Sequence, residues 1–272
     1  MPRGVNSYDE ARLQGRLWTP NPATSPVWFD PLVQSSLTYS GSNITTVRNL
    51  AGNNFDLVSG SCRYDSFHHG FLFDGTSEFI SSTTTQALGK DFGIVCELNP
   101  ASLSQVSICC PVDWEHASTI PGQFGPMNVQ TLNGNTNFYF AYSDGSTFFF
   151  TNSPRMGVLP ANQWSLCSMF VSDGTSYNYL NGALASGFPR FGGGPVATAL
   201  RRFQLGSAIS LPRFFNGRIG SVRIFTSPSI PAIQREEGRI AWRRLALTAN
   251  RKLIDALPAS HPYRNLPPLI GD

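Results

Sequence analysis

The chain has 272 residues, enough for one large domain or two small ones at about 150 residues per domain. Charged residues make up only 14% of it, whereas Gly and Pro contribute 25 and 20 residues, a composition that argues against a helical bundle or a coiled coil. The hydrophobic fraction of 41% argues against a disordered chain, because it suffices to build a core. The net charge of +3 conceals an asymmetry, with residues 1–189 at −6 and residues 190–272 at +9.

The basic side chains of the C-terminal part are almost all arginines. The planar donor fork of Arg suits interfaces with carboxylates, phosphates or aromatic faces. The charge of this part therefore indicates contact with nucleic acid or with an acidic protein. The alternative is that these arginines form an ordinary solvated surface. Between Arg235 and Lys252, where these basic residues are densest, Trp242 is the single aromatic residue that could stack on a base, and no binding motif is present. We therefore expect a protein neighbour and no nucleic acid.

The cysteines indicate folding in a reducing compartment. Their number is odd, and no CxxC pair or zinc-type Cys/His spacing is present, so we expect buried thiols and no metal site. The first residues lack the apolar stretch of a signal peptide, and no run approaches the roughly 18 apolar residues of a membrane span. We expect synthesis in a cytoplasm without a signal peptide, and no membrane insertion. The cysteines are Cys62, Cys96, Cys109, Cys110 and Cys167.

Residues 1–26 are predicted to form an N-terminal arm. Ser7 and Glu10 have the spacing of a capping box, which favours a short helix over about residues 8–17. Three prolines then force an extended linker. An arm with a few apolar anchors and no core of its own packs either on its own domain or on a partner.

Residues 27–226 show strands and turns with no helix between them. Runs rich in Phe, Val and Ile alternate with turn signals such as residues 143–146 and 173–174, which predicts antiparallel hairpins. Strands recurring over this length predict an all-β sandwich or jelly roll. The predicted core comprises Phe73, Phe79, Phe92, Ile94, Phe138, Phe140, Trp164, Leu166, Phe170, Phe203, Ile219, Val222 and Ile224.

Residues 227–272 are predicted to form a helix followed by a tail. The helix begins near Pro231, since Pro is tolerated in a first turn, and runs to about Leu247. Glu236 and Glu237 precede Arg239, Arg243 and Arg244 along it, which suits the helix dipole. The tail from Ala256 to Asp272 is rich in Pro and is expected to lie over a surface of the domain.

Three segments of the chain resemble concanavalin A-like (laminin-G-like) lectin/glucanase domains. They are residues 73–80 (FDGTSEFI), the hairpin pattern of Trp164, Asp173-Gly174 and Asn181-Gly182, and residues 215–225 (FNGRIGSVRIF). Together they span about residues 27–226. The resemblance implies a concanavalin A-like jelly-roll sandwich, extended by the N-terminal arm and by the C-terminal helix and extended tail.

The flanking segments resemble proteins of tailed bacteriophages and prophages that carry this domain. The similar segments are residues 11–20 with 28–30, and residues 237–242 with 257–263, where Arg239 departs from the Tyr of that pattern. The resemblance implies a non-enzymatic structural protein at the virion surface, made in the host cytoplasm. Its partners would be other virion proteins, further copies of itself and host-surface glycans. A tail, baseplate or fibre component that contacts glycans is the first hypothesis, and a capsid decoration protein is the alternative.

Hydrolysis of glycans is a remote alternative. Asp113 and Glu115 are the one pair of carboxylates that alternate along a predicted strand, as the paired carboxylates of a glucanase would. The glucanase string ExDxxE is absent, however, so we expect no catalytic residues.

A carbohydrate site would need an aromatic platform with carboxylates or amides beside it. Loops rich in Asn and Asp also ligate calcium in this fold, so Ca²⁺ is a candidate cofactor, although Asn and Asp are common in any turn. The predicted carbohydrate-binding residues are Trp114, Glu115, Asn135, Tyr142 and Asp144.

Both ends of the chain carry apolar and arginine anchors. Since first and last strands of such a sandwich often lie together, we expect the two ends to form one docking face for a virion partner. The alternative is that the anchors pack on their own subunit. The predicted docking residues are Leu13, Arg16, Leu17 and Trp18 at one end, and Arg243, Arg244, Tyr263 and Arg264 at the other.

Overall fold

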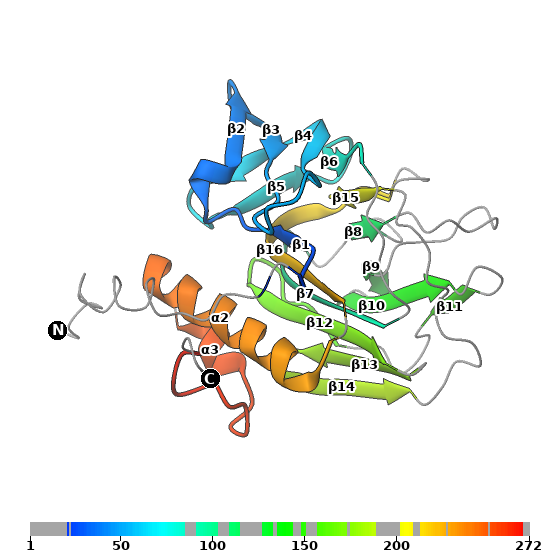
Figure 1. Ribbon diagram of the computed structural model, residues 1–272, viewed down its shortest axis with the longest axis vertical. Helices are drawn as coiled ribbons and strands as arrows, with labels where there is room; N and C mark the ends of the chain where they lie inside the picture. The colour runs from blue at the N-terminus through cyan, green and yellow to red at the C-terminus, as the bar shows by residue number, and fades with distance from the viewer. Residues whose placement is uncertain are drawn as a thin grey trace.

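A computed structural model gives the structure of the chain (Figure 1). It describes residues 21, 23–84, 91–102, 109–114, 127–132, 135–143, 148–150, 157–172, 175–188, 202–208, 213–226, 228–249 and 251–268. Within these residues, burial of side chains is described except for residues 109–110, 114, 127–132, 135–143, 148–150, 171, 175–176 and 185–188.

The described residues form an antiparallel β-sandwich with a C-terminal helix, as predicted. Hydrogen bonds join the strands in the order β11-β10-β9-β8-β15-β6-β4-β5-β16-β7-β12-β13-β14, with β1 on β16 and β2-β3 on β4. The strands are β1 (Val27–Phe29), β2 (Leu37–Ser40), β3 (Asn43–Val47), β4 (Leu57–Asp65), β5 (Gly70–Asp74), β6 (Phe79–Ser82), β7 (Phe92–Pro100), β8 (Cys109–Trp114), β9 (Met127–Leu132), β10 (Asn135–Ser143), β11 (Phe148–Phe150), β12 (Ser165–Ser172), β13 (Thr175–Leu180), β14 (Ala183–Phe188), β15 (Phe203–Leu205) and β16 (Asn216–Thr226); a 3-10 turn, η1, covers Gln34–Ser36.

Strand β16 occupies the middle of this arrangement. It pairs with β5 on one side and β7 on the other, and β1 also pairs with its C-terminal half, with Val27 opposite Ile224. The first and last strands therefore lie together, as expected. Hydrogen bonding to β16 begins before β1, because the amide of Thr226 donates to the carbonyl of Thr24 at 2.9 Å and Ser25 Oγ donates to that of Ile224 at 3.0 Å.

The inner core confirms most of the core prediction. Phe79 and Trp164 are corrections, because both are half-buried, Phe79 at the start of β6 and Trp164 just before β12. Phe138 and Phe140 lie in β10, outside the described side chains. The confirmed residues, all at most 4% exposed, are Phe73, Phe92, Ile94, Leu166, Phe170, Phe203, Ile219, Val222 and Ile224.

The predicted hairpins are present. Ser143 of β10 faces Phe148 of β11, and Ser172 of β12 faces Thr175 of β13. The turn between β13 and β14 needs left-handed backbone at Asn181 and Gly182, with φ of 50° and 75°, which is the conformation that Asn-Gly adopts at least cost.

Helix α2 (Ile230–Thr248) lies across the face of β7, β12 and β13 (Figure 1). It begins one residue before the predicted Pro231, because the hydroxyl of Ser229 caps it by accepting from the amide of Ala232. A second core lies beneath the helix, in which Ile233 and Ile240 contact the sheet residues Val95, Leu166, Phe170, Tyr179 and Phe225. Burial of these apolar residues holds the helix on the sheet.

The described residues of the tail lie over the surface of the domain, beside α2 and the turn between β13 and β14. The tail is not wholly extended, because a short helix, α3 (Lys252–Ala256), places Leu253 and Ile254 in the second core. Beyond α3 the tail returns along α2, and the indole Nε1 of Trp242 donates to the carbonyl of Tyr263 at 2.8 Å. Among the described residues, no helix combines the length and apolarity that crossing a bilayer requires.

Candidate functional site

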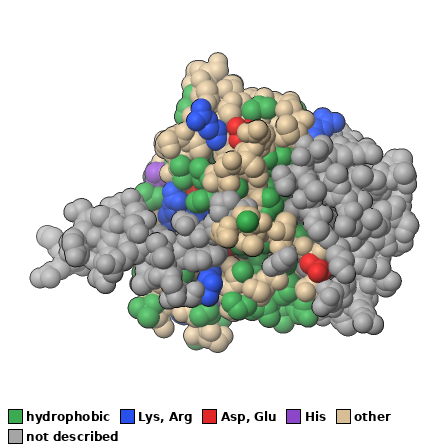
Figure 2. All heavy atoms as spheres, viewed as in Figure 1, with side chains coloured by type: hydrophobic (Ala, Val, Ile, Leu, Met, Phe, Trp, Pro, Cys, Tyr) green, Lys and Arg blue, Asp and Glu red, His purple; other side chains and the backbone are tan. Residues whose placement is uncertain are grey.

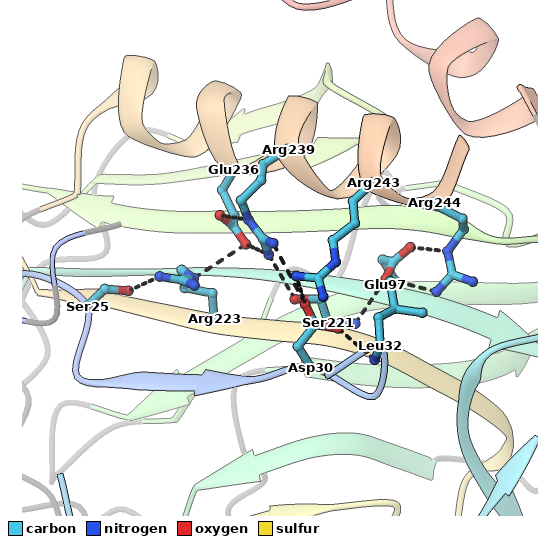
Figure 3. A network of polar contacts seen from close by, with 10 residues as sticks. All are labelled: Ser25, Asp30, Leu32, Glu97, Ser221, Arg223, Glu236, Arg239, Arg243 and Arg244. Atoms are coloured by element: carbon cyan, nitrogen blue, oxygen red, sulfur yellow. Dashed lines mark hydrogen bonds and ion pairs between the residues drawn. The ribbon is translucent and has the colours of Figure 1, made fainter. Parts of the chain in front are cut away.

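A row of buried ion pairs lies between α2 and the sheet (Figure 3). The carboxylates of Asp30, Glu97 and Glu236 are fully buried, and burial of a charge is costly unless it is paired and hydrogen-bonded. The basic members of the row are Arg223, Arg239 and Arg244, at most 3% exposed, and Arg243.

Glu236 anchors one end of the row. Its carboxylate accepts from Arg239 at 2.6 and 2.8 Å and lies 3.4 Å from Nε of Arg223, whose guanidinium covers the indole of Trp28 at 4.0 Å. Burial lowers the pKa of Arg239, but the Glu236 carboxylate raises it by more; for Arg223, burial prevails and the pKa is lowered. This end ties the helix to β16 and to β1.

Glu97 anchors the other end. Its carboxylate accepts from Arg244 Nε at 2.5 Å, from Arg244 Nη2 at 3.1 Å and from the amide of Ser221 at 2.9 Å. Gly220 gives it room, because a Cβ at that position would collide with Glu97 Oε2. The irregular register of β16 between Ile219 and Val222 turns the Ser221 amide toward the carboxylate.

Arg244 also contacts the turn at residues 66–69, which connects β4 and β5. Its Nη1 donates to the carbonyl of His68 at 2.8 Å, and its Nη2 to that of His69 at 3.3 Å. The same guanidinium lies 3.9 Å from the centre of the Trp164 ring. One side chain thus joins helix α2, strand β7, the turn at residues 66–69 and Trp164.

Within this chain Arg243 and Arg244 pair with Asp30 and Glu97, and their role in docking a partner stays a prediction. Arg244 is 3% exposed and is fully engaged by Glu97 and the two carbonyls. Arg243 is 23% exposed and pairs with Asp30 at 3.0 Å. On the face shown in Figure 2, the Lys and Arg side chains are scattered over the described part and form no basic patch.

A cavity of about 560 Å³, here called the helix pocket, lies beside Arg244. This volume falls within the ~300–1,000 Å³ typical of small-molecule sites. The C-terminal turn of α2, helix α3, the turn at residues 66–69 and the segment before β12 surround it. Its lining residues are Phe67, His68, His69, Asn99, Pro160, Asn162, Gln163, Trp164, Ser165, Asn181, Arg244, Leu247, Thr248, Lys252, Leu253 and Ala256.

Two aromatic rings line the helix pocket, one half-buried in its wall and one exposed at its rim. Trp164 is half-buried in its wall under the guanidinium of Arg244. Phe67 is 84% exposed at the tip of the turn, with its ring edge-on to His68 at 4.8 Å between centroids. Phe67 and Trp164 together therefore place aromatic surface on the lining of the helix pocket.

A single carboxylate holds the turn that carries Phe67. Asp65 accepts from the amides of Phe67 and His68 at 3.0 and 2.9 Å, from His68 Nδ1 at 2.8 Å and from Arg218 Nε at 2.6 Å. Burial raises the pKa of the Asp65 carboxyl, but the hydrogen bonds from Arg218 and His68 lower it by more, and the result lies far below its ordinary value. The turn is therefore ordered by an ionised Asp65.

His69 is held in a strained and neutral form. Its φ of 53° lies in the left-handed region, which is uncommon for a residue with a side chain and is found at functional sites. Its Nδ1 lies 3.0 Å from the hydroxyl of Tyr64. Burial, and then the charge of Arg244, lower the pKa of His69, so the imidazole is neutral at about pH 7.

Amide side chains supply the remaining polar groups. Asn162 and Gln163 are exposed at the pocket, whereas Asn99 is fully buried at its base, on the helix-facing side of β7. Neither Oδ1 nor Nδ2 of Asn99 has a hydrogen-bond partner. An unsatisfied buried polar group costs about 1–3 kcal/mol.

The predicted carbohydrate-binding residues do not line the helix pocket. Trp114 ends β8, while Asn135 and Tyr142 lie in β10, on strands at the other end of the sheet order from α2 (Figure 1). Their side chains, and Glu115 and Asp144 entirely, lie outside the described residues. Asp113, the other half of the carboxylate pair, is 3% exposed within β8.

Sequence reasoning missed the helix pocket because its parts are far apart in the chain. Glu97 and Arg244 are separated by 147 positions, and Asp65 and Arg218 by 153. The one local signal is the polar pair Asn162-Gln163 directly before Trp164. Trp164 is placed in the predicted core without use of this signal.

The docking residues are placed only at the C-terminal end. The N-terminal group (Leu13, Arg16, Leu17, Trp18) lies outside the described residues. Tyr263 accepts from Arg235 Nε at 3.3 Å through its hydroxyl, and Arg264 Nη1 donates to the carbonyl of Leu257. Both side chains are half-buried, so they brace the tail and leave only part of their surface for a partner.

The described histidine and cysteine side chains do not form a metal site. Among the described residues, no three His, Cys, Asp or Glu side chains are grouped closely enough to hold an ion. His261 is buried against Glu237, 3.2 Å from its Oε2. Burial raises the pKa of the Cys96 and Cys167 thiols, which remain free. Calcium binding stays a prediction.

Comparison with known proteins agrees with this architecture. Residues 74–231 match the family model of the concanavalin A-like lectin/glucanases superfamily. None of the curated proteins matches the chain.

Two solved structures illustrate the likeness. Domain 4 of the GH43 extracellular arabinanase AbnA from Geobacillus stearothermophilus, in complex with arabinotriose, is 16% identical with a TM-score of 0.51, and covers 77% of this chain and 96% of its own. The botulinum neurotoxin serotype D ligand binding domain, in complex with N-acetylneuraminic acid, is 11% identical with a TM-score of 0.52 over 78% of this chain. This chain spans about half of that toxin domain, 50% of its length.

Proposed function

This chain belongs to the concanavalin A-like lectin/glucanase superfamily, and on that premise we propose that it is a non-enzymatic, glycan-binding protein of a tailed-phage particle. The helix pocket is its binding site. The observation that carries the proposal is the grouping of an exposed Phe67, the indole of Trp164 and several amide and imidazole groups around one cavity.

These side chains match the chemistry of a sugar. A pyranose has an apolar face that packs on aromatic rings and hydroxyl groups that both donate and accept hydrogen bonds. The wall provides Phe67 and Trp164 for the first, and Asn162, Gln163 and the two histidines for the second. Two fold neighbours hold saccharides in their structures, which supports the class of ligand and not its identity.

A binding role is favoured over hydrolysis by the composition of the pocket. Cleavage of a glycosidic bond by the usual route needs two carboxyl groups on opposite sides of the bond. Among the described residues lining the helix pocket, none is Asp or Glu. Asp65 and Glu97 stand behind the lining, each held by arginine.

The phage context rests on the terminal segments of the sequence. Residues 11–20 and 257–263 resemble those of tailed-phage proteins with this domain. We propose a homo-oligomer on the virion surface, in which residues 1–20 dock on another virion protein and the helix pocket faces the host glycan.

The glycan-binding proposal is tested by screening the full chain on a glycan array and measuring affinity for any ligand found. Phe67→Ala removes an exposed ring and should weaken binding about tenfold while leaving the melting temperature unchanged. Tyr39→Ala is the matched control, because Tyr39 is a 42% exposed aromatic residue outside the pocket lining. If Trp114→Ala abolishes binding and Phe67→Ala does not, the site lies at the predicted β8–β10 loops and the helix pocket is not the binding site.

The location is tested by electron microscopy of particles labelled with an antibody against the chain. Label on the tail, baseplate or fibres supports the proposal. Label spread evenly over the head supports a capsid decoration protein instead, and absence of label from particles contradicts a virion role.

A further inference from the structure

One wall of the helix pocket is apolar and accessible. The last turn of α2 and helix α3 contribute Leu247, Leu253 and Ala256, here called the helical wall. Leu247 and Ala256 are exposed, so a ligand in the pocket can touch them. The turn at residues 66–69 and the segment before β12 contribute the imidazole and indole groups and two of the amides. A ligand that contacts both sets has to carry an apolar group beside polar ones.

Trp164 presents an unused donor to the pocket. The guanidinium of Arg244 lies 3.9 Å from the centre of its ring, and a Cβ at Gly70 would lie 2.8 Å from its Cη2, so the indole is closely held. Its Nε1 makes no hydrogen bond with the described residues and, unlike that of Trp28, is not sealed from solvent. An indole N–H only donates, so the partner that a ligand brings has to be an acceptor.

The helical wall lies close to this indole. Leu247 follows Arg244 by three positions on α2, so the two side chains lie on the same face of the helix. The Arg244 guanidinium covers the Trp164 ring, and Trp164 packs against the second core, to which Leu253 belongs. An acceptor on Nε1 and an apolar group on Leu247 can therefore belong to one small substituent.

Gln163 supplies the complementary polar group. Its side chain is exposed on the lining directly before Trp164, and it makes no hydrogen bond with the described residues. The carboxamide of Gln accepts as well as donates. Residues 163 and 164 thus offer a ligand an acceptor and a fixed donor side by side in the chain.

We infer that the helix pocket recognises the acetamido group of an N-acetylated amino sugar. The carbonyl oxygen of this group accepts from Nε1 of Trp164, and its N–H donates to Oε1 of Gln163. Its methyl group packs against Leu247 and Ala256, while the pyranose ring packs on Phe67. A sugar with a hydroxyl group at this position leaves the helical wall in contact with water. The inference rests on the proposed glycan-binding function and names the ligand class of that site, with Trp164 as a specificity-determining residue.

The experiment compares sugars that differ only in this substituent. N-acetylglucosamine and glucose, N-acetylgalactosamine and galactose, and N-acetylmannosamine and mannose are titrated into the full chain and followed by NMR. The same comparison is made with any larger ligand found on the array and its counterpart with hydroxyl groups in place of the acetamido groups. Burial of one methyl group is equivalent to about fourfold in affinity, and one hydrogen bond to about fivefold.

An N-acetylated ligand should therefore bind at least about tenfold more tightly than its hydroxyl counterpart. Its acetyl methyl group should receive the strongest saturation transfer from the protein. Equal affinities within every pair, or binding only of glycans without an N-acetyl group, overturn the inference and leave glycan binding intact. Failure of the chain to bind any glycan removes the proposed function together with it.

Two variants test the contacts separately. Trp164→Phe keeps an aromatic ring under Arg244 and removes the N–H, so affinity for the N-acetylated ligand should fall about fivefold. Leu247→Asn changes an exposed residue and should reduce that affinity about fourfold without altering binding of the hydroxyl counterpart. Leu266→Asn is the matched control, because Leu266 is an exposed leucine outside the pocket lining. Melting temperatures identify any loss of folding, and an unchanged preference for the acetamido group in both folded variants overturns the inference.

Discussion

Arg244 shows how much one side chain can organise. It bears a formal charge yet is 3% exposed, and it contacts Glu97, the carbonyls of His68 and His69, and the ring of Trp164. It therefore orients the wall of the helix pocket without needing to touch a ligand. Its role is that of a positioning residue.

Arg244→Ala should destabilise the protein by about 3–5 kcal/mol, because Glu97 would remain buried without its partner. Urea denaturation at about pH 7 measures the change. Arg251→Ala is the matched control, since Arg251 and Asp255 pair at the surface with side chains 53% and 57% exposed, and loss of such a pair costs about 0–1 kcal/mol. Equal effects of the two substitutions would show that the Glu97 pair is not what holds the helix.

At the scale of elements, the turn at residues 66–69 and helix α2 are two walls of the helix pocket that are held by different contacts. The carboxylate of Asp65 holds the turn through hydrogen bonds. The cap at Ser229 and the buried ion pairs hold the helix. Each can be loosened separately, which allows the contribution of each wall to be measured.

The turn should loosen in acid. The folded pKa of Asp65 lies below its ordinary value of 3.8, so its carboxylate contributes stability that is complete above that value and is lost as the pH falls through the folded pKa. Asp65→Asn keeps the shape and the hydrogen bonds from the amides but removes the charge. The variant should be less stable than the parent at about pH 7, and the difference should shrink toward about pH 2.

Thermal denaturation across this pH range measures the difference. Asp255→Asn, at a 57% exposed carboxylate, should differ little from the parent at any pH. A gap between parent and Asp65→Asn that stays constant in acid would contradict the assignment.

The helix cap predicts a smaller effect. Ser229→Ala removes the hydroxyl that accepts from the amide of Ala232 at 3.3 Å and should cost about 1 kcal/mol. Ser229→Asp retains an acceptor and places a negative charge at the helix N-terminus, so it should restore the stability. Urea denaturation compares the three proteins, and an unstable Ser229→Asp would argue against the cap.

At the scale of the whole molecule, the residues just before β1 belong to the sheet, and deletions can separate their role from that of residues 1–20. Thr24 and Ser25 are hydrogen-bonded to β16, although the predicted docking arm includes them. Deletion of residues 1–20 should leave the melting temperature within a few degrees, whereas deletion of residues 1–26 should lower it markedly, because it removes these hydrogen bonds to the central strand β16.

Both deletions should prevent incorporation into particles if the arm docks on a virion partner. Incorporation is measured by the amount of the chain in purified particles. Normal incorporation of the protein lacking residues 1–20 would contradict the docking role.

The fold could be predicted from the sequence because its signals are local. The largely apolar run at residues 92–98, the turn signal at residues 173–174 and the helix start near Pro231 each depend on neighbours in the chain. The site could not be predicted in this way. Arginines are ordinarily exposed, and the burial of Arg244 follows from a glutamate 147 positions away that no short-range pattern identifies.

The central position of β16 has a consequence for the order in which the chain folds. Strands β1, β5 and β7 each pair with it, yet residues 216–226 leave the ribosome after all three. During synthesis, β5 and β7 therefore wait with open edges, which are exposed to pairing with other chains. Closure is a late, long-range event, and such topologies fold slowly. The growing chain thus depends on protection of these edges until β16 arrives between them.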